Sequence, residues 1–387
     1  MSDPRTQDVL ALTAELVGID SVNPSLVAGA AGEHAIAGFV RDWSAACGLD
    51  TRLVAGPDGR PSVIVRGGNG FRGRTLLLCG HLDTVGHGSM ADPLAAALDA
   101  GRLYGRGGYD MKAGLAAALV ACRDATAAGI GGQVLVAAVA DEEHASTGIQ
   151  AVLNRLGADG VTIDAAVVTE PTELEVAVAH KGFVWTEIEV IGRAAHGSRP
   201  HLGIDAISRT GPVLLALDRF DRELAARPPH PLLGLSSVHA SLISGGTEAS
   251  TIPERCTLTI ERRTLPGQTV GEVEADVARL LDRCRRDQPD LTVRTRTTLA
   301  RHALQTPEHE PIVTMMLAAA MRTDARPRIP TGLSYWADSA FLAAAGIPTV
   351  LFGPSGDGAH ADIEWVEADS VRACAQALTT LARDFSA

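Results

Sequence analysis

The segment VLVAAVADEEHASTG, from Val134 to Gly148, begins as an apolar run and then carries three consecutive acids, Asp141, Glu142 and Glu143. Like charges crowded together at the end of a buried strand are unfavourable unless a cation lies nearby. On an extended chain, neighbouring side chains point to opposite sides, so Glu142 and Glu143 can face different groups. The segment therefore raises the question of which cation the protein places there.

Four other places, most of them at the ends of expected strands, bring histidine or carboxylate side chains into loops. They are His81 and Asp83 in CGHLDTV, Asp110 in GRLYGRGGYDMKAG, Glu170 in VVTEPT, and His360 in GPSGDGAHADIEWV. His81 can bind a metal through one ring nitrogen while the Asp83 carboxylate orients the ring from the other side. Taken singly, each place also has an ordinary explanation, such as a buried structural histidine or, for Asp110, a helix cap.

Taken together, these side chains form a ligand set of two histidines and three carboxylates, with Glu142 left for catalysis. Such a set without a thiolate suits zinc, cobalt or manganese, and a bridging carboxylate suits two ions about 3.5–4 Å apart. Ligands of an open α/β sheet bind outside the carboxyl ends of its strands, so the separate places can converge on one site.

The surrounding pattern predicts the elements that would position this site. Apolar residues at helical spacing predict helices over 8–17 and 33–47, and MKAGLAAALVACRDATAAG predicts an alanine-rich helix that ends at Gly129. The segments PSVIVRG, RTLLLCGHLDTV, QVLVAAVADEE and DAAVVTEPT predict buried strands. This alternation predicts an α/β domain with helices on both faces of a mixed, mostly parallel sheet.

The residue pattern changes near His180, where GFVWTEIEVIG and CTLTIERRTLPG alternate apolar with polar residues. Alternation of this kind is typical of half-exposed antiparallel strands, and helical patterns lie at 204–224 and 270–286. We therefore predict an inserted α+β domain at 180–298, within a discontinuous metal-binding catalytic domain formed by 1–179 and 299–387.

Composition narrows the class of protein. A chain of 387 residues is long enough for two domains, and a net charge of -12 argues against nucleic-acid or anionic-membrane partners. The sequence shows neither the features of a signal peptide nor an apolar stretch long enough to span a membrane. Its six cysteines are far apart without a CxxC pair, which indicates core thiols in a reducing compartment, and we predict a cytoplasmic location.

The order and spacing of the motifs resemble the M20 family of metallopeptidases and deacylases, which includes acetylornithine deacetylase, succinyl-diaminopimelate desuccinylase, aminoacylase-1 and a glutamate carboxypeptidase. The resemblance runs from about Val9 to Ala382. It implies two divalent ions, zinc first and cobalt or manganese as alternatives. It further implies that Asp110 bridges the ions, that His81 and Glu170 complete the shell of one ion, and that Glu143 and His360 complete the other.

The resemblance also implies roles outside the ligand set. Asp83 would orient His81, and Glu142 would be the general base. In GRAAHGSRPHLGIDAI, His196 would reach across a homodimer, formed through the inserted lid domain, to stabilise the oxyanion in the partner's site. In GGTEASTIPERCTLTIERRTLPG, Arg263 would hold a substrate carboxylate, and Ser250 stands at a substrate-binding position where many relatives have Asn.

These features predict a metal-dependent amidohydrolase that cleaves the amide bond of an N-acyl amino acid, in the manner of acetylornithine deacetylase. A dipeptidase or glutamate-type carboxypeptidase uses the same ligands and stays open as an alternative. Two other classes also stay open: a non-catalytic binding or dimerisation protein with this fold, and a nucleotide-binding enzyme built on GRGGYD. Asp141 has no assigned role beyond positioning its loop, and His144 is a candidate for specificity.

Overall fold

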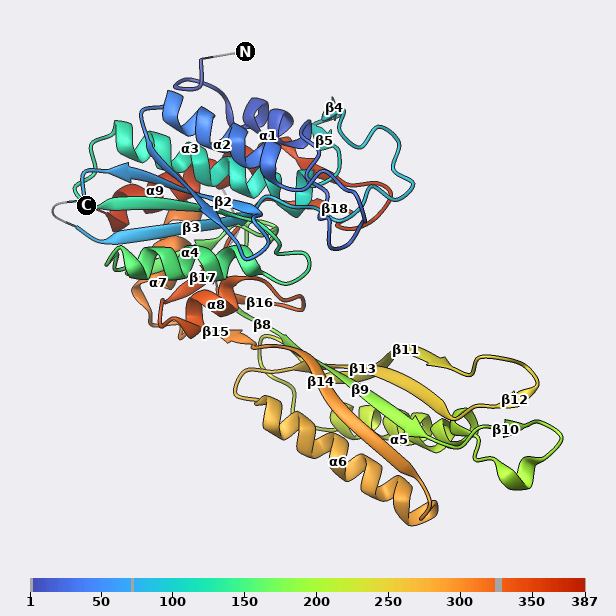
Figure 1. Cartoon of the computed structure of the whole chain (residues 1–387). Coiled ribbons are helices and arrows are strands. Elements are labelled where there is room, and N and C mark those ends of the chain that lie inside the picture. The colour runs from blue at the N-terminus through green and yellow to red at the C-terminus, as the bar shows by residue number, and fades with distance from the viewer. Residues whose placement is uncertain (1–2, 71–72, 324–328, 387) are drawn as a thin grey trace. The chain divides into compact units, whose positions relative to one another are not determined.

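The computed structural model describes residues 3–70, 73–323 and 329–386. The chain divides into two compact units, shown with their elements in Figure 1. The first unit comprises Met1–Val178, Thr306–Thr331 and Ala337–Ala387, and the second comprises Ala179–Gln305 and Gly332–Trp336. The segment predicted as an insertion lies within the second unit, which extends a few residues further at its carboxyl end and also includes the short piece at 332–336.

The first unit is built on a mixed sheet. Its strands are β1 (Asp50–Ala55), β2 (Pro61–Gly68), β3 (Thr75–His81), β6 (Gln133–Val139), β7 (Ala165–Val168), β8 (Ala177–His180), β15 (Leu304–Gln305), β16 (Thr331–Leu333) and β17 (Thr349–Leu351). The last two residues of β8, the last two of β16 and all of β15 belong to the second unit. They are ordered β1-β2-β6-β3-β7-β17-β8-β15, with β16 beside β8. The central strands β6, β3, β7 and β17 run parallel, whereas β1, β2, β8 and β15 pair antiparallel. The predicted mixed, mostly parallel sheet is therefore confirmed.

Helices cover both faces of this sheet. They are α1 (Val9–Val17), α2 (His34–Ala46), α3 (Ala113–Ala127), α4 (Thr147–Ala158), α7 (Pro311–Met321), α8 (Ser339–Ala344) and α9 (Ala368–Phe385). Helices α1, α3 and α9 pack together on one face, and α4 and α8 lie on the other (Figure 1). At the start of α3, a Cβ on Gly114 would lie 1.9 Å from the carbonyl oxygen of Thr169. Only glycine permits this approach, which seats the segment carrying Asp110 beside the end of β7.

A small antiparallel sheet joins two loops that are far apart in the sequence. It contains β4 (Ala97–Asp99), β5 (Arg102–Tyr104), β18 (Gly356–Asp357) and β19 (Trp365–Glu367). The glycine-rich loop after β5 leads into a short helical turn, η1 (Gly108–Lys112), and the loop between β18 and β19 carries His360. Pairing of β5 with β19 therefore brings the Asp110 and His360 segments to the same place.

The second unit packs helices on one face of an antiparallel sheet. Its strands are β9 (Gly182–Ile191), β10 (Ala195–His196), β11 (Ser237–Gly245), β12 (Thr251–Ile252), β13 (Arg255–Thr264) and β14 (Thr292–Arg301), and its helices are η2 (Pro200–Leu202), α5 (Ala206–Ala225) and α6 (Val270–Asp287). The larger sheet has the order β11-β13-β9-β14, and β10 pairs with β12. Every second residue of β13 is buried, and the buried set joins a core with apolar residues of α5 and α6. The half-buried alternation visible in the sequence thus marks a sheet with one open face.

All six cysteines are free thiols, and five of them are buried. In the part of the chain that the structure describes, no helix is both long enough and apolar enough to cross a membrane.

Candidate metal centre

The parallel strands deliver the acidic and histidine side chains to one edge of the sheet. Strands β3 and β6 pair with His81 opposite Val139, just before the segment that holds Glu142 and Glu143. Strand β7 pairs with β3 on its other side and ends two residues before Glu170. Neighbouring parallel strands end on the same side, so these side chains meet at the carboxyl edge.

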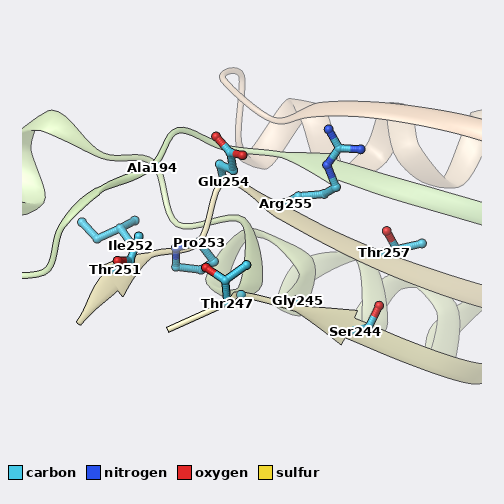
Figure 2. Close-up of a pocket in the computed structure, with 11 residues that line it drawn as sticks. Ala194, Ser244, Gly245, Thr247, Thr251, Ile252, Pro253, Glu254, Arg255 and Thr257 are labelled. Atoms are coloured by element: carbon cyan, nitrogen blue, oxygen red, sulfur yellow. The ribbon is translucent and has the colours of Figure 1, made fainter. Parts of the chain in front are cut away.

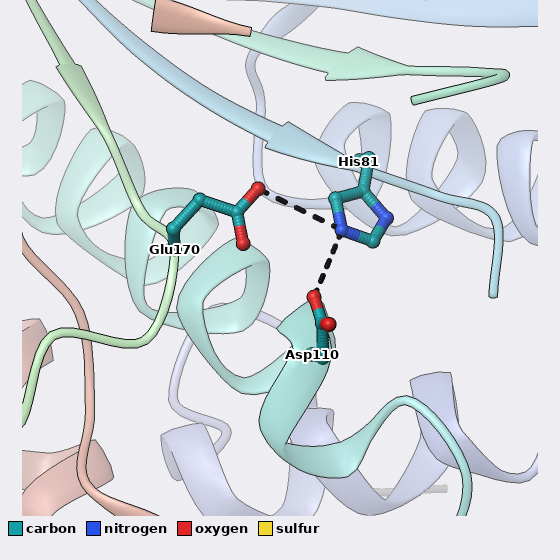
Figure 3. Close-up of side chains that lie close together, drawn as sticks. All are labelled: His81, Asp110 and Glu170. Carbon is teal, nitrogen blue, oxygen red and sulfur yellow. Dashed lines mark hydrogen bonds and ion pairs between the residues drawn. The ribbon is translucent and has the colours of Figure 1, made fainter. Parts of the chain in front are cut away.

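The first group of possible ligands comprises His81, Asp110 and Glu170 (Figure 3). The Nε2 atom of His81 lies 3.2 Å from Oδ1 of Asp110 and 3.7 Å from Oε1 of Glu170. The potential ligand atoms of the group all lie within 4.8 Å of one another. His81 and Glu170 are buried, so these groups are largely removed from bulk water.

The second group comprises Asp110, Glu143 and His360. The Nε2 atom of His360 lies 3.3 Å from Oδ2 of Asp110 and 3.1 Å from Oε2 of Glu143. Asp110 thus belongs to both groups, and its two oxygens face different histidines. A carboxylate shared in this way is the geometry expected of a bridge between two ions.

The donor set fits two divalent cations. It consists of imidazole nitrogens and carboxylate oxygens, which suit zinc, cobalt and manganese. Burial lowers the pKa of His81, but the carboxylates of Glu170 and Asp110 raise it more, so the net pKa lies well above the usual value. Hydrogen bonds with Asp110 and Glu143 raise the pKa of His360 to about 10. The clustered carboxylates therefore attract positive charge, which protons supply when metal is absent.

This electrostatic arrangement predicts how metal-free protein responds to pH. The pKa of His360 rises from 6.5 to about 10 on folding, so its contribution to stability is complete below pH 6.5 and is lost as the pH approaches 10. Burial raises the pKa of Glu170 to about 8, so ionisation of this carboxyl also lowers stability as the pH rises. We expect chelator-treated protein to melt at a lower temperature at about pH 9.5 than at about pH 6. Scanning calorimetry would measure this difference, and His360→Asn should reduce it; an unchanged melting temperature would contradict the prediction.

The segment around Glu142 is a turn, so the prediction of an extended chain is wrong. Asp141 has φ 68°, in the left-handed region, and residues Glu142 to Ala145 form turns. Glu143 points into the second ligand group, whereas Glu142 belongs to neither group. Burial raises the pKa of Glu142 well above the usual value, against the opposing effect of His81. A carboxyl with a raised pKa beside the ligand groups is suited to proton transfer.

Asp83 contacts His81 in a way that corrects the sequence-based expectation. The Nδ1 atom of His81 lies 2.8 Å from the main-chain oxygen of Asp83, but 3.9 Å from its Oδ1 atom. A carbonyl oxygen can only accept, so Nδ1 carries a proton, and Nε2 is the nitrogen that a metal would bind in place of its proton. The Asp83 carboxylate instead accepts hydrogen bonds from the main-chain N–H groups of Glu142 (3.1 Å) and Glu143 (3.2 Å).

Glu364 supports the site, although no role was predicted for it from the sequence. Its buried carboxylate accepts hydrogen bonds from the main-chain N–H groups of Gly107, Tyr109 and Asp110, at 3.0 to 3.1 Å. Arg106 forms a buried ion pair with it at 2.7 Å. The one visible signal was its place four residues after His360 in the same loop. Glu364 thus fastens the loop of Asp110 to the loop of His360.

Removal of the Glu364 carboxylate should lower the stability of the protein. We expect Glu364→Ala to lower the free energy of unfolding by about 3–5 kcal/mol, because it leaves Arg106 buried without its charged partner. Urea unfolding of metal-free protein would measure the change. Glu187→Ala is a matched control: it breaks the exposed pair between Glu187 and Arg296, which should cost less than about 1 kcal/mol. Equal losses in the two variants would contradict the assignment.

The remaining predicted site residues belong to the second unit, where Arg263 lies apart from His196 and Ser250. His196 is exposed, with its Nδ1 atom 2.8 Å from Oγ of Ser198. Ser250 is its neighbour, because the N–H of Gly197 donates to the Ser250 carbonyl oxygen at 2.7 Å. Arg263 lies at the other end of β13, eight residues after the start of that strand, or roughly 26 Å along it.

Arg263 is already paired in this structure. Its Nε atom lies 2.6 Å from Oε1 of Glu261, and its guanidinium lies 5.3 Å from the centre of the Phe183 ring. A substrate carboxylate at this position would have to compete with Glu261. The same unit contains a cavity of about 340 Å³, lined by the end of β11, by β12 and by the start of β13. Figure 2 shows the residues that line it. None of the predicted site residues lines it.

Comparisons with known proteins identify similar sequences and similar folds. Acetylornithine deacetylase of Myxococcus xanthus is 29% identical over 337 residues, which cover 84% of this chain and 83% of the relative. The structure resembles that of an M20 family metallo-carboxypeptidase, Sso-CP2 from Sulfolobus solfataricus, with a TM-score of 0.80, 17% identity and coverage of 98% and 100% of the two chains. It also resembles the Bacillus subtilis YXEP protein, described as a dinuclear metal binding peptidase from the M20 family, with a TM-score of 0.74, 15% identity and coverage of 98% and 97%.

A family-wide comparison covers most of the sequence. Residues 77–384 match Peptidase family M20/M25/M40, a range that includes both ligand groups, Glu142 and the whole second unit. The chain therefore belongs to peptidase family M20/M25/M40.

Proposed function

We propose that the protein is a metal-dependent amidohydrolase that removes the acyl group from an N-acyl amino acid. As a family member it is a hydrolase acting on carbon–nitrogen bonds, which confirms that part of the prediction. The observation that carries the proposal is the pair of ligand groups that share Asp110, with Glu142 close enough to interact electrostatically with His81, Glu170 and Glu143. The match to an acetylornithine deacetylase over 84% of this chain supports the substrate class.

The two ligand groups would each hold one ion. His81, Asp110 and Glu170 would bind the first, and Asp110, Glu143 and His360 the second. Two divalent ions would lower the pKa of a bound water toward about 7 and would polarise the acyl carbonyl. Zinc is the first choice of metal, with cobalt and manganese as alternatives. The description of the Bacillus subtilis relative as dinuclear supports the count of two.

Glu142 would move the proton. Its carboxylate would accept a proton from the attacking water and pass it to the leaving amine. The raised pKa of Glu142 favours this role, since a base must hold the proton between the two steps. Asp83 would contribute by holding the main chain of Glu142 and Glu143 in place.

A substrate panel tests the proposal. Metal-free enzyme would be loaded with zinc, cobalt or manganese and assayed with N-acetyl amino acids, including acetylornithine, with N-succinyl amino acids and with dipeptides. We expect kcat/KM for an N-acetyl amino acid to exceed that for any dipeptide by at least about tenfold, a difference of about 1.4 kcal/mol in transition-state binding. A preference for dipeptides would instead support the second candidate, a dipeptidase or carboxypeptidase, which the likeness to a metallo-carboxypeptidase structure favours.

We also propose that the second unit forms a homodimer and that His196 of one copy serves the site of its partner. His196 and Arg263 lie at opposite ends of the sheet, so one copy of this unit cannot bring both to the same substrate. Strand β11 is an edge strand with Leu242 and Ile243 exposed, at 70% and 55%. The opposite edge, β14, carries exposed Arg294 and Arg296 among its threonines. Arginine on an edge strand discourages pairing, whereas exposed apolar residues invite it.

The dimer is testable by charging the β11 edge. The double variant Leu242→Lys with Ile243→Lys should shift the protein to monomers and lower kcat by about 10²-fold or more, as expected when an oxyanion donor is lost. Sedimentation velocity and kinetics would measure the two effects. The control Thr295→Lys with Thr298→Lys, on β14, should leave both unchanged. A fully active monomer would exclude this role for His196.

We further propose that the protein works in the cytoplasm. Its cysteines are all free thiols, which suits a reducing compartment. Fractionation of the source cells with an antibody against the protein would test this location.

A further inference from the structure

The cation nearest Asp141 is an arginine. Arg60, immediately before β2, places its Nη1 atom 2.6 Å from Oδ1 of Asp141. The same guanidinium pairs with Glu33, through Nη2 and through Nε, the latter at 2.9 Å from Oε2. The side chains of Arg60, Glu33 and Asp141 are 8%, 0% and 3% exposed. One buried guanidinium therefore compensates two buried carboxylates.

Asn23 extends this cluster to the main chain of the two glutamates. Its Nδ2 atom donates to Oδ1 of Asp141 at 3.2 Å and to Oδ2 of Asp83 at 2.8 Å. Asp83 in turn accepts the N–H groups of Glu142 and Glu143. A continuous set of buried and partly buried contacts thus runs from Arg60 to the peptide groups of the residues that would bind metal and move the proton.

The conformation of Asp141 explains why such a cluster is needed. Its φ of 68° is disfavoured for a residue with a side chain, and the turn that follows places Glu142 and Glu143. Its Oδ2 atom accepts a hydrogen bond from Oγ1 of Thr147 at 2.7 Å, and its Oδ1 atom receives Arg60 and Asn23. Contacts on both oxygens hold the carboxylate in one orientation and thereby hold the turn.

The chemistry of the cluster singles out arginine. A buried carboxylate that loses its cation is strongly unfavourable, so Asp141 and Glu33 depend on Arg60. The planar guanidinium can meet Glu33 through two nitrogens and Asp141 through a third, whereas a lysine ammonium is a single compact charge. Among the contacts of the described residues, Arg60 is the cation within hydrogen-bond distance of both carboxylates.

We infer that Arg60 is a positioning residue for the hydrolysis: through Asp141, Asn23 and Asp83 it fixes the turn that carries Glu142 and Glu143. This inference rests on the proposed function. Loss of Arg60 should loosen the ion held by Glu143 and His360 more than the ion held by His81 and Glu170. It should also slow proton transfer by Glu142, with little effect on substrate binding.

The test compares Arg60→Met with two other variants. Arg60→Lys keeps the positive charge but loses the planar guanidinium with its three donor nitrogens. It should weaken zinc binding and lower kcat less than Arg60→Met does. Arg123→Met is the matched control, because Arg123 is also a buried arginine of the first unit, but its hydrogen bonds go to the main-chain oxygens of Pro4 and Gln7 and the side chain of Asp124. Metal-free proteins would be titrated with zinc against a chromophoric chelator, and kcat and KM would be measured at saturating zinc.

We expect Arg60→Met to weaken one of the two zinc-binding steps by about 10–100-fold, the range typical of residues that support metal ligands, and to lower kcat by a similar factor. The other binding step and KM should stay within about threefold of wild type. Arg123→Met should keep both binding steps and kcat within about threefold, even where its melting temperature falls.

Wild-type binding and kcat in Arg60→Met would overturn the inference, and so would equal losses in Arg123→Met. If Arg60→Met does not fold, Asn23→Ala replaces it in the test, and the same fold-changes in zinc binding and kcat are expected. This variant removes the hydrogen bonds that link Asp141 to Asp83 without removing a charge. The proposed function is judged separately, on wild-type protein. A wild type that binds no zinc and hydrolyses no amide refutes that function, and the inference falls with it.

Discussion

Glu142→Gln is expected to lower kcat by about 10³-fold while both metal ions stay bound. The glutamine amide has nearly the shape of the carboxyl group, but it cannot accept a proton from water, and general acid–base catalysis contributes about 10²–10⁴-fold. Glu142 belongs to neither ligand group, so metal binding should be unaffected. Steady-state kinetics, together with elemental analysis of dialysed protein, would measure both properties.

The matched control for this variant is Glu175→Gln, which neutralises an exposed carboxylate of the same unit outside both ligand groups. It should keep kcat within about twofold of wild type. Preserved turnover in Glu142→Gln would remove Glu142 from the mechanism. Loss of metal together with turnover would show that Glu142 is a ligand rather than the base.

Asp110→Ala is expected to abolish binding of both ions and with it all measurable hydrolysis. Asp110 contributes one oxygen to each ligand group, so its removal deprives both ions of a charged ligand at once. We expect each binding constant to fall by more than about 10²-fold, beyond the loss typical of residues that only support ligands. Zinc titration of metal-free protein and elemental analysis after dialysis would check this.

Variants of residues that belong to only one ligand group allow the two ions to be distinguished in the same experiment. Glu170→Gln should weaken mainly one ion and His360→Ala mainly the other, because each residue belongs to one group only. His144→Asn is a suitable control, since His144 is half exposed beside the loop but lies outside both groups. Retention of two tightly bound ions by Asp110→Ala would refute the bridging role, whereas loss of one ion would assign Asp110 to a single site.

Much of the first unit could be predicted because its signals are local. The apolar runs that end at His81 and before Asp141 are buried strands, as their composition indicates, and the alanine-rich segment after Asp110 is a buried helix. The identity of the potential ligands was also visible, since histidines and carboxylates at strand ends are read directly from the sequence. The residues that surround them were not visible, because Glu364 meets the N–H of Asp110 across 254 positions of the chain.

The sequence by itself determined the strands, the helices and the donor set, because periodicity and residue chemistry act over a few neighbouring positions. Only the tertiary structure decided that Asp110 faces two histidines and that Asp83 accepts the main-chain N–H groups of Glu142 and Glu143. It also decided that the chain turns at Asp141 and that Arg60 is the cation paired with this residue. A buried carboxylate pairs with whichever donors the packed strands and loops bring to it. That choice depends on contacts between distant segments, which no local pattern records.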